Sequence, residues 1–215
     1  MRKIIAIIAA VPSFVMVGAA TDFPAAEAFL GYNFVRFNTN SGIVPSFNAN
    51  GGDGQFAYNV NKYLGVVVDL GAVNKGTLQG FNFDTTVVNF VAGPRFTWRH
   101  HDSRFQPFVQ ALFGGAYATT SVPIDITVPV INPGPPGGIL QPNGPVTARL
   151  VASNTGFAMM AGGGLDIKLN KHVAFRPVGL DYYQTRVPGL LTGTTTSKLN
   201  NFRYSAGINF LFGKM

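Results

Sequence analysis

The densest group of potentially reactive side chains in this sequence is His100, His101, Asp102 and Ser103. Imidazole, carboxylate and hydroxyl groups are the parts of a serine-type triad, and imidazole and carboxylate also ligate metals. Residues that are adjacent in a tight turn, however, rarely converge on one reacting atom. The third histidine of the chain, His172, also falls in a predicted short turn. The cluster therefore predicts a solvated turn, and we expect no catalytic residue, no cofactor and no metal site.

Other chemical motifs are equally weak. A run of three glycines at residues 162–164 could suggest a phosphate-binding loop, but such a loop lies between a strand and a helix, and this run lies inside a predicted strand. We expect these glycines to relieve crowding in a packed interior. The chain contains no cysteine, which excludes disulfides, thiol nucleophiles and thiolate metal sites.

The elements that position these residues are predicted to be β-strands. In residues 202–212, Phe202, Tyr204, Phe210 and Phe212 share one parity, whereas Arg203 and its alternate neighbours are mostly small or polar. Because successive side chains of a strand point to opposite faces, one face of this strand is apolar and aromatic. The same alternation recurs along the chain and predicts eight strands, at residues 27–38, 51–60, 64–73, 86–98, 105–117, 156–169, 173–185 and 201–212.

The connections between these strands alternate in length. Residues 61–62, 99–104 and 170–172 form short turns, and the long loops are residues 39–50, 74–84, 118–155 and 186–200. Short periplasmic turns and long outside loops are typical of transmembrane β-barrels. Segments 124–130 and 146–151 could prolong the fifth and sixth strands outside the membrane. Prolines inside strands predict bulges or local breaks at Pro94, Pro107 and Pro177.

Parity divides the side chains into an outward and an inward set. The outward set is apolar: Leu30, Tyr32, Phe34, Val66, Val68, Leu70, Val88, Phe90, Phe96, Val109, Phe113, Leu165 and Ile167. The inward set is polar: Glu27, Asn33, Asp69, Asn89, Arg95, Gln106, Gln110, Asp166, Lys168, Arg176, Asp181, Arg203 and Asn209. A soluble β-sandwich would have the opposite arrangement, so the pattern favours an all-β, eight-stranded antiparallel up-and-down transmembrane β-barrel.

Buried charges must be paired, and the interior of an eight-stranded barrel is only wide enough for side chains to fill it. We therefore expect a lumen charge network in place of an open channel, formed by Asp69, Asp166 and Asp181 with Arg95, Arg176 and Arg203. Aromatic side chains should form belts at the two membrane interfaces. The residues expected there are Tyr63 and Trp98 near short turns, and Tyr117 and Phe157 near long loops.

Residues 1–20 read as a cleavable signal peptide, with Arg2 and Lys3, an apolar stretch, and Gly18, Ala19 and Ala20 as a small-residue cleavage site. Residues 21–215 then form the outer-membrane β-barrel domain. Without the two leader cations, the formal charge of +7 falls to +5. These charges are not clustered, so they do not suggest a nucleic-acid partner.

The final strand carries Ser205, Gly207, Phe210 and Phe212 at alternating spacing. This resembles the terminal signal by which the barrel assembly machinery recognises its clients, although residues 213–215 follow the usual final aromatic. With the signal peptide and the opening strand at residues 29–34, the mature chain resembles small outer-membrane β-barrel proteins of the OmpA/OmpX-like class. The resemblance implies export to the periplasm, insertion into the bacterial outer membrane, and contact with outer-membrane lipid and lipopolysaccharide.

The leading functional hypothesis is a non-enzymatic barrel with a structural or surface-interaction role, whose outer loops contact an unidentified ligand. A narrow pore for ions or small solutes is the first alternative. A lipid A modifying enzyme is less favoured, because such enzymes place their histidine near the outer leaflet and all three histidines here map to short turns. A soluble lipocalin-like carrier is the fourth reading.

Overall fold

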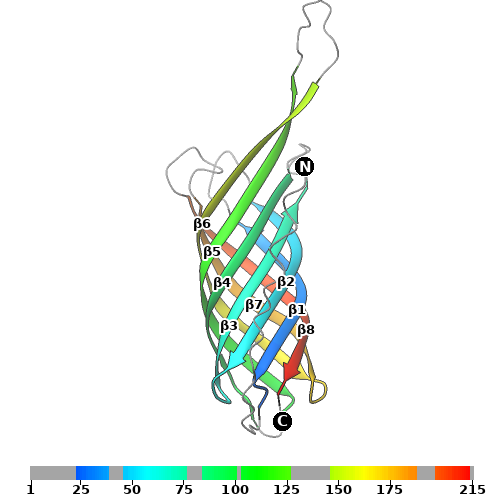
Figure 1. The fold of residues 1–215 in the computed structure, drawn as a ribbon, viewed down its shortest axis with the longest axis vertical. Coiled ribbons are helices and arrows are strands. Elements are labelled where there is room, and N and C mark those ends of the chain that lie inside the picture. The colour runs from blue at the N-terminus through cyan, green and yellow to red at the C-terminus, as the bar shows by residue number, and fades with distance from the viewer. Residues whose placement is uncertain are drawn as a thin grey trace, which may run out of the picture.

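The computed structural model describes residues 23–38, 46–76, 84–100, 103–126, 146–187 and 197–213. They form eight antiparallel strands that close into one barrel in chain order, which confirms the expected fold class (Figure 1). The strands are β1 (Ala26–Phe37), β2 (Phe47–Asn59), β3 (Leu64–Lys75), β4 (Asp84–Thr97), β5 (Phe105–Ile126), β6 (Val146–Lys168), β7 (Val173–Val187) and β8 (Ser197–Phe212). Within the described segments, no helix is long and apolar enough to cross a bilayer. The expected signal peptide, residues 1–20, lies outside them.

Pairing of the first strand with the last closes the sheet. The ladder between β1 and β8 runs from Ala26 opposite Phe212 to Arg36 opposite Phe202, and β1 pairs with β2 on its other side. Closure matters because lipid offers no hydrogen-bonding groups, so an open strand edge in the hydrocarbon would be costly. We call the end of the barrel that carries both described termini and the connections β2–β3, β4–β5 and β6–β7 the short-turn end, and the opposite end the loop end.

Two of the short turns share one local structure. The side-chain oxygen of Asn61 accepts hydrogen bonds from the backbone N–H groups of Tyr63 and Leu64, both at 2.8 Å. Asn170 accepts the same pair of bonds from His172 and Val173, also at 2.8 Å. An asparagine that bonds to the backbone two and three residues ahead stabilises a tight turn. The repeated Asn-Lys pair thus builds matching hairpins.

At the loop end, the strands run further than the alternation predicts. Strand β2 begins at Phe47, β5 continues to Ile126, and β6 begins at Val146. The loops expected at 39–50, 74–84, 118–155 and 186–200 are therefore too long at their edges. These edges are rich in Thr, Ser and Asn. They pair as strands, but they lack the alternation of apolar and polar residues from which the membrane-facing strands were predicted. The sequence analysis anticipated part of the extensions of β5 and β6, at residues 124–130 and 146–151.

The prolines disturb the ladders unequally. The β7–β8 register shifts between Arg176 and Gly179, which confirms a bulge at Pro177. Pro94 pairs with Val66 of β3 but falls in a gap in the β4–β5 ladder, which is the expected local break. The expectation for Pro107 is wrong. This proline keeps its register with β6, and its carbonyl accepts a 2.9 Å bond from the N–H of Trp98, just past the end of β4, where no ladder donor is needed.

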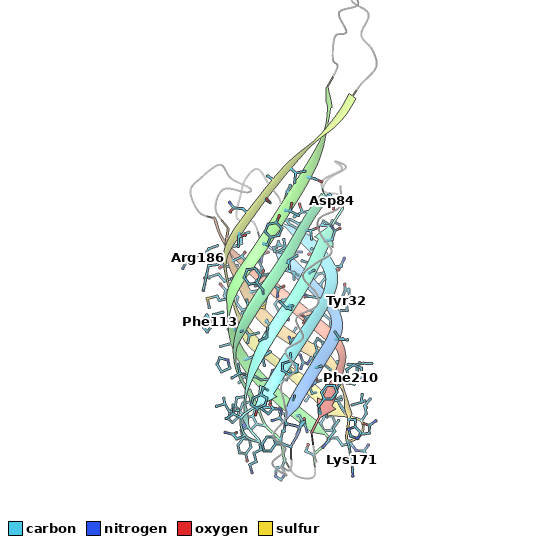
Figure 2. The ribbon with its side chains drawn as sticks, in the orientation of Figure 1. Tyr32, Asp84, Phe113, Lys171, Arg186 and Phe210 are labelled. Atoms are coloured by element: carbon cyan, nitrogen blue, oxygen red, sulfur yellow. The ribbon has the colours of Figure 1, made fainter. Side chains whose placement is uncertain are left out.

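The outer surface carries an apolar band around the barrel, and every member of the predicted outward set is exposed or half-exposed. Figure 2 shows Tyr32, Phe113 and Phe210 on the outside of the wall, with Asp84 and Arg186 nearer the loop end. On β8, the six residues of the band run from Phe202 to Phe212. Ten residue steps at about 3.3 Å each and a tilt of about 40° give a band about 25 Å tall, which matches the hydrocarbon of an outer membrane.

Val68 lies in the middle of this band on β3 and is 46% exposed. We expect Val68→Arg to destabilise the folded protein by about 2–4 kcal/mol, because the charge would face the centre of the hydrocarbon. Ser153→Arg, on an exposed residue of β6 beyond the band, should cost no more than about 1 kcal/mol. Urea titration in liposomes, followed by the fluorescence of Trp98, measures both values. Equal costs would contradict the assignment of the band to lipid.

Candidate functional site: the filled barrel interior

The centre of the interior is organised around Arg203 of β8. Its guanidinium donates to Asp69 at 2.5 and 3.0 Å and to Asp53 at 2.8 Å, and its Nε lies 3.6 Å from a carboxylate oxygen of Asp181. Arg203, Asp53 and Asp69 have fully buried side chains. Buried pairs of this kind hold only when hydrogen bonds satisfy the remaining polar atoms, and Asn89 supplies one such bond to Asp69 at 2.7 Å. The guanidinium of Arg203 on β8 thus interacts with carboxylates of three other strands, β2, β3 and β7.

A second arginine, Arg176 of β7, lies closer to the short-turn end. It forms a two-bond ion pair with Asp166 of β6, at 2.6 and 3.0 Å. Its guanidinium carbon lies 4.2 Å from the ring centre of Phe29 and 4.4 Å from that of Phe108. Cation–π contacts of this kind gain strength when the cation is removed from water. The glycine at 164 makes room for this arrangement, because a Cβ there would lie 2.8 Å from the Phe108 ring.

Arg95 differs from the expectation, since it is bonded to amides and to no carboxylate that the described residues supply. Its guanidinium donates to Gln55 and, at 2.8 and 3.2 Å, to Gln110. The same glutamines donate onward, Gln55 to Asp69 at 2.8 Å and Gln110 to Asp181 at 3.1 Å. Amide side chains can accept from an arginine and donate to a carboxylate at once. The two glutamines therefore link Arg95 to the aspartates around Arg203.

The short-turn end of the interior is closed by a group that parity did not assign. Arg99 follows β4 and turns inward, where it forms an ion pair with Glu27 and donates to Asn59 at 3.2 Å. Glu27 also accepts bonds from Asn59 and Asn209, each at 2.8 Å. Arg99 lies outside every strand, so alternation gives no direction for its side chain. Its position after the last residue of β4, facing Glu27, is a feature of the three-dimensional fold.

Charges in the interior nearly balance, with five carboxylates facing four guanidiniums in the described part of the chain. These groups are Glu27, Asp53, Asp69, Asp166 and Asp181 with Arg95, Arg99, Arg176 and Arg203. More than half of the nine acidic residues of the sequence therefore lie inside the barrel. Because ions without partners are costly in a dry interior, this near balance is what permits so many of them there.

An apolar layer, missed by the sequence analysis, lies above the charged network. On each strand the charged and amide residues come nearer the short-turn end, and the inward residues beyond them are mostly aliphatic or aromatic. The members of this layer are Val35, Phe37, Phe47, Ala49, Val73, Val87, Val91, Leu112, Ala116, Ala118, Ala158, Met160 and Tyr183. Phe37 packs on Phe47 at 5.1 Å and on Tyr183 at 6.5 Å between ring centres. The interior thus has a charged half and a mainly apolar half.

The remaining predicted residues lie on the wall and at the ends. Tyr63 and Trp98 are exposed at the short-turn end, and Tyr117 and Phe157 are exposed nearer the loop end. On the closing strand β8, Ser205 is buried, Gly207 is half-buried, and Phe210 and Phe212 are exposed. The interfacial role of the four aromatics and the assembly role of the β8 residues stay predictions.

The histidine-rich turn is only partly described. His100 is exposed at the short-turn end, whereas His101 and Asp102 lie outside the described residues. Among the residues that are described, no group of three or more His, Cys, Asp or Glu is arranged to hold a metal. The glycines at 162–164 lie within β6, and their added Cβ atoms would collide with the neighbouring strands β5 and β7.

No protein-family model matches the chain, and no curated protein has a sequence that matches it significantly. Solved structures do match its fold. Ail, the attachment invasion locus protein of Yersinia pestis, is similar with a TM-score of 0.55 and 14% identity over 87% of this chain and 99% of Ail. Neisserial surface protein A has a TM-score of 0.54 and 14% identity over 87% of this chain and 97% of its own.

A further structure of Ail, in complex with the heparin analogue sucrose octasulfate, has a TM-score of 0.52 and 15% identity over 86% of this chain and 97% of that one. At these identities the similarity establishes the fold. The chain has the fold of the small, OmpA/OmpX-like outer-membrane β-barrels, which confirms the resemblance drawn from its sequence. The expected location in the bacterial outer membrane agrees with this fold.

The ion pair of Arg176 with Asp166 tests how much the network contributes to stability. Arg176→Met should destabilise the protein by about 3–5 kcal/mol, because it leaves Asp166 charged and unpaired. Adding Asp166→Leu should restore part of that loss, since both charges are then gone. The matched control is Arg36→Met, because Arg36 is exposed on β1 and bonds to Asn48. Urea titration in liposomes measures all four proteins, and a double variant no more stable than the single one would contradict the prediction.

Proposed function

We propose that this chain is a non-enzymatic, non-conducting outer-membrane β-barrel that presents a surface ribbon for contact with an external protein. The observation that carries the proposal is the pairing of β5 with β6 beyond the barrel wall. The ladder between them continues from Ser121 opposite Val151 to Ile126 opposite Val146. Figure 1 shows this two-stranded ribbon rising well above the other strands.

The ribbon has an unpaired edge along β6. Strand β6 pairs with β7 only from Phe157 onward, so residues 146–153 pair in the sheet with β5 alone within the described part of the chain. The N–H of Lys168 bonds to the β5 side and that of Leu169 to the β7 side. By the same alternation, the N–H groups of Val151 and Ser153 point away from β5. An unpaired edge of this kind accepts an extended strand from another protein.

The filled interior supports a role other than transport. A solute crossing the barrel would have to pass the apolar layer and then displace the ion pairs of Arg203 and Arg176. Both barriers are built of buried side chains that pack or bond with one another. A pore would instead need a continuous hydrated path, as wider barrels have.

The distribution of the histidines supports a non-enzymatic role. His100 and His172 lie at the short-turn end, which faces the periplasm if the barrel has the usual orientation. A lipid A modifying enzyme would require its reactive groups at the other end of the barrel. One structural neighbour, Ail, carries the name attachment invasion locus protein, which is the kind of surface role proposed for this chain.

Planar-bilayer recording tests the filled interior. We expect the purified protein to insert without steady conductance, because ions would meet the apolar layer. Insertion is verified separately by heat modifiability, in which a closed barrel migrates as a compact species until it is boiled. Steady single-channel conductance from compact protein would overturn the non-conducting part of the proposal and favour the pore.

The β6 edge is tested by proline substitution. Val151→Pro with Ser153→Pro removes two edge donors while leaving the β5–β6 hydrogen bonds in place, so we expect binding of extended peptides to fall at least tenfold. Val151→Thr with Ser153→Thr is the matched control and should bind like the native protein. Affinities are measured by passing a library of extended peptides over the full chain in lipid nanodiscs. Equal binding by both double variants, or no binding peptide at all, would contradict the edge as the contact surface.

A further inference from the structure

A hollow of about 380 Å³ opens at the short-turn end of the barrel. It lies between the β2–β3 turn and the segment that follows β4, and it is lined by Lys62, Tyr63, Trp98, Arg99 and His100. Arg99 fastens the two segments together by donating a 2.8 Å bond to the carbonyl of Lys62. The hollow is therefore held by the fold at the edge of the apolar band, where the hydrocarbon of a membrane meets its headgroups.

The apolar side of the hollow is formed by the rings of Tyr63 and Trp98, and the ring of Phe96 packs against both. Tyr63 stacks on Phe96 with 5.8 Å between ring centres, and Phe96 meets the edge of Trp98 at 4.7 Å. Phe96 lies in β4, Trp98 just after it and Tyr63 just before β3, and all three rings are exposed at this end of the barrel. Tyr and Trp side chains are suited to this depth because they combine an apolar ring with a polar group.

The polar side of the hollow is cationic. Lys62 is exposed, and its ammonium lies 4.7 Å from the centre of the Tyr63 ring. The side chain of Arg99 is 7% exposed, and its Nε has no hydrogen-bond partner among the described residues. The ion pair with Glu27 offsets the charge of Arg99, which leaves Lys62, with the exposed His100 beside it, as the main source of positive charge.

We propose that this hollow binds one phospholipid of net negative charge in the periplasmic leaflet, with its phosphate at Lys62 and its acyl chains on the rings of Trp98 and Phe96. The combination of charge and rings favours this ligand. A free phosphate would use the cations and leave the aromatic surface uncovered, whereas a phospholipid has an anionic group directly attached to apolar chains. The inference rests on the membrane location of the barrel and is independent of the ribbon.

The chain contains an internal control for this site. The β6–β7 turn repeats the Asn-Lys pair and its backbone bonds, but His172 stands where the first turn has Tyr63. Lys171 is therefore an exposed lysine in a matching turn at the same end of the barrel, without the ring that lies beneath Lys62. If general attraction to anionic lipid were responsible, the two lysines would contribute equally.

Trp98 is the only tryptophan of the chain and lines the hollow, so its fluorescence reports on lipid bound there. The full chain is placed in bilayers of phosphatidylcholine, and brominated phosphatidylglycerol or brominated phosphatidylcholine is added as a quencher. We expect phosphatidylglycerol to bind about fivefold more strongly, the effect of one lysine near an anionic group. Lys62→Gln should abolish this preference, and Lys171→Gln should leave it unchanged.

Equal quenching by the two lipids in the native protein, or equal loss in the two glutamine variants, would overturn the inference. Relief of quenching by millimolar inorganic phosphate would show that the site takes a free anion, which also overturns it. These results leave the proposed function intact. Failure of either brominated lipid to quench Trp98 would overturn the membrane location itself, and with it both proposals.

Discussion

The hydrogen-bonded ladder between β1 and β8 is the constraint on which the rest of the structure depends. By closing the sheet, it gives every strand two partners through the apolar band, where lipid offers none. Closure at eight strands also fixes the width of the interior, which side chains can fill completely. The inward residues therefore cannot remain hydrated as they could in a wide pore, and each buried charge must find a partner within the wall. The network around Arg203 and Arg176 follows from this geometry.

The interior meets this demand in two ways along its length. In the half nearer the short-turn end, carboxylates and guanidiniums pair directly, and the two glutamines extend the hydrogen bonding to Arg95. Phe29 and Phe108 cover the faces of Arg176, and the glycine at 164 leaves space for the second ring. In the half nearer the loops most interior residues are apolar and need no partner, and some buried polar residues there bond to one another, as Thr85 does with Thr120. Charged side chains thus fill one half of the interior, and mainly apolar side chains fill the other.

Alternation in the sequence predicts the direction of most wall residues, because a strand obeys it regardless of its partners. It does not predict which inward residues meet. That depends on the tilt and stagger of the strands, so Asp53 and Gln55 were not identified as partners of Arg203 and Arg95. On β2 the glycines at 51, 52 and 54 also weaken the alternation that would have pointed to them. Arg99 was missed for another reason, since it lies in a turn and its inward direction comes from Glu27.

The β5–β6 ribbon is under different constraints from the wall below it. Beyond Ser121 and Val151 the backbone of each strand pairs with the other strand of the ribbon, and no described residue of β4 pairs with β5 there. Substitutions in the interior would leave charges unpaired, which is a cost that the backbone ladder of the ribbon does not itself impose. The interior and the apolar band thus carry the packing and ion pairs that stabilise the barrel. The ribbon proposed as a contact surface lies outside both of them.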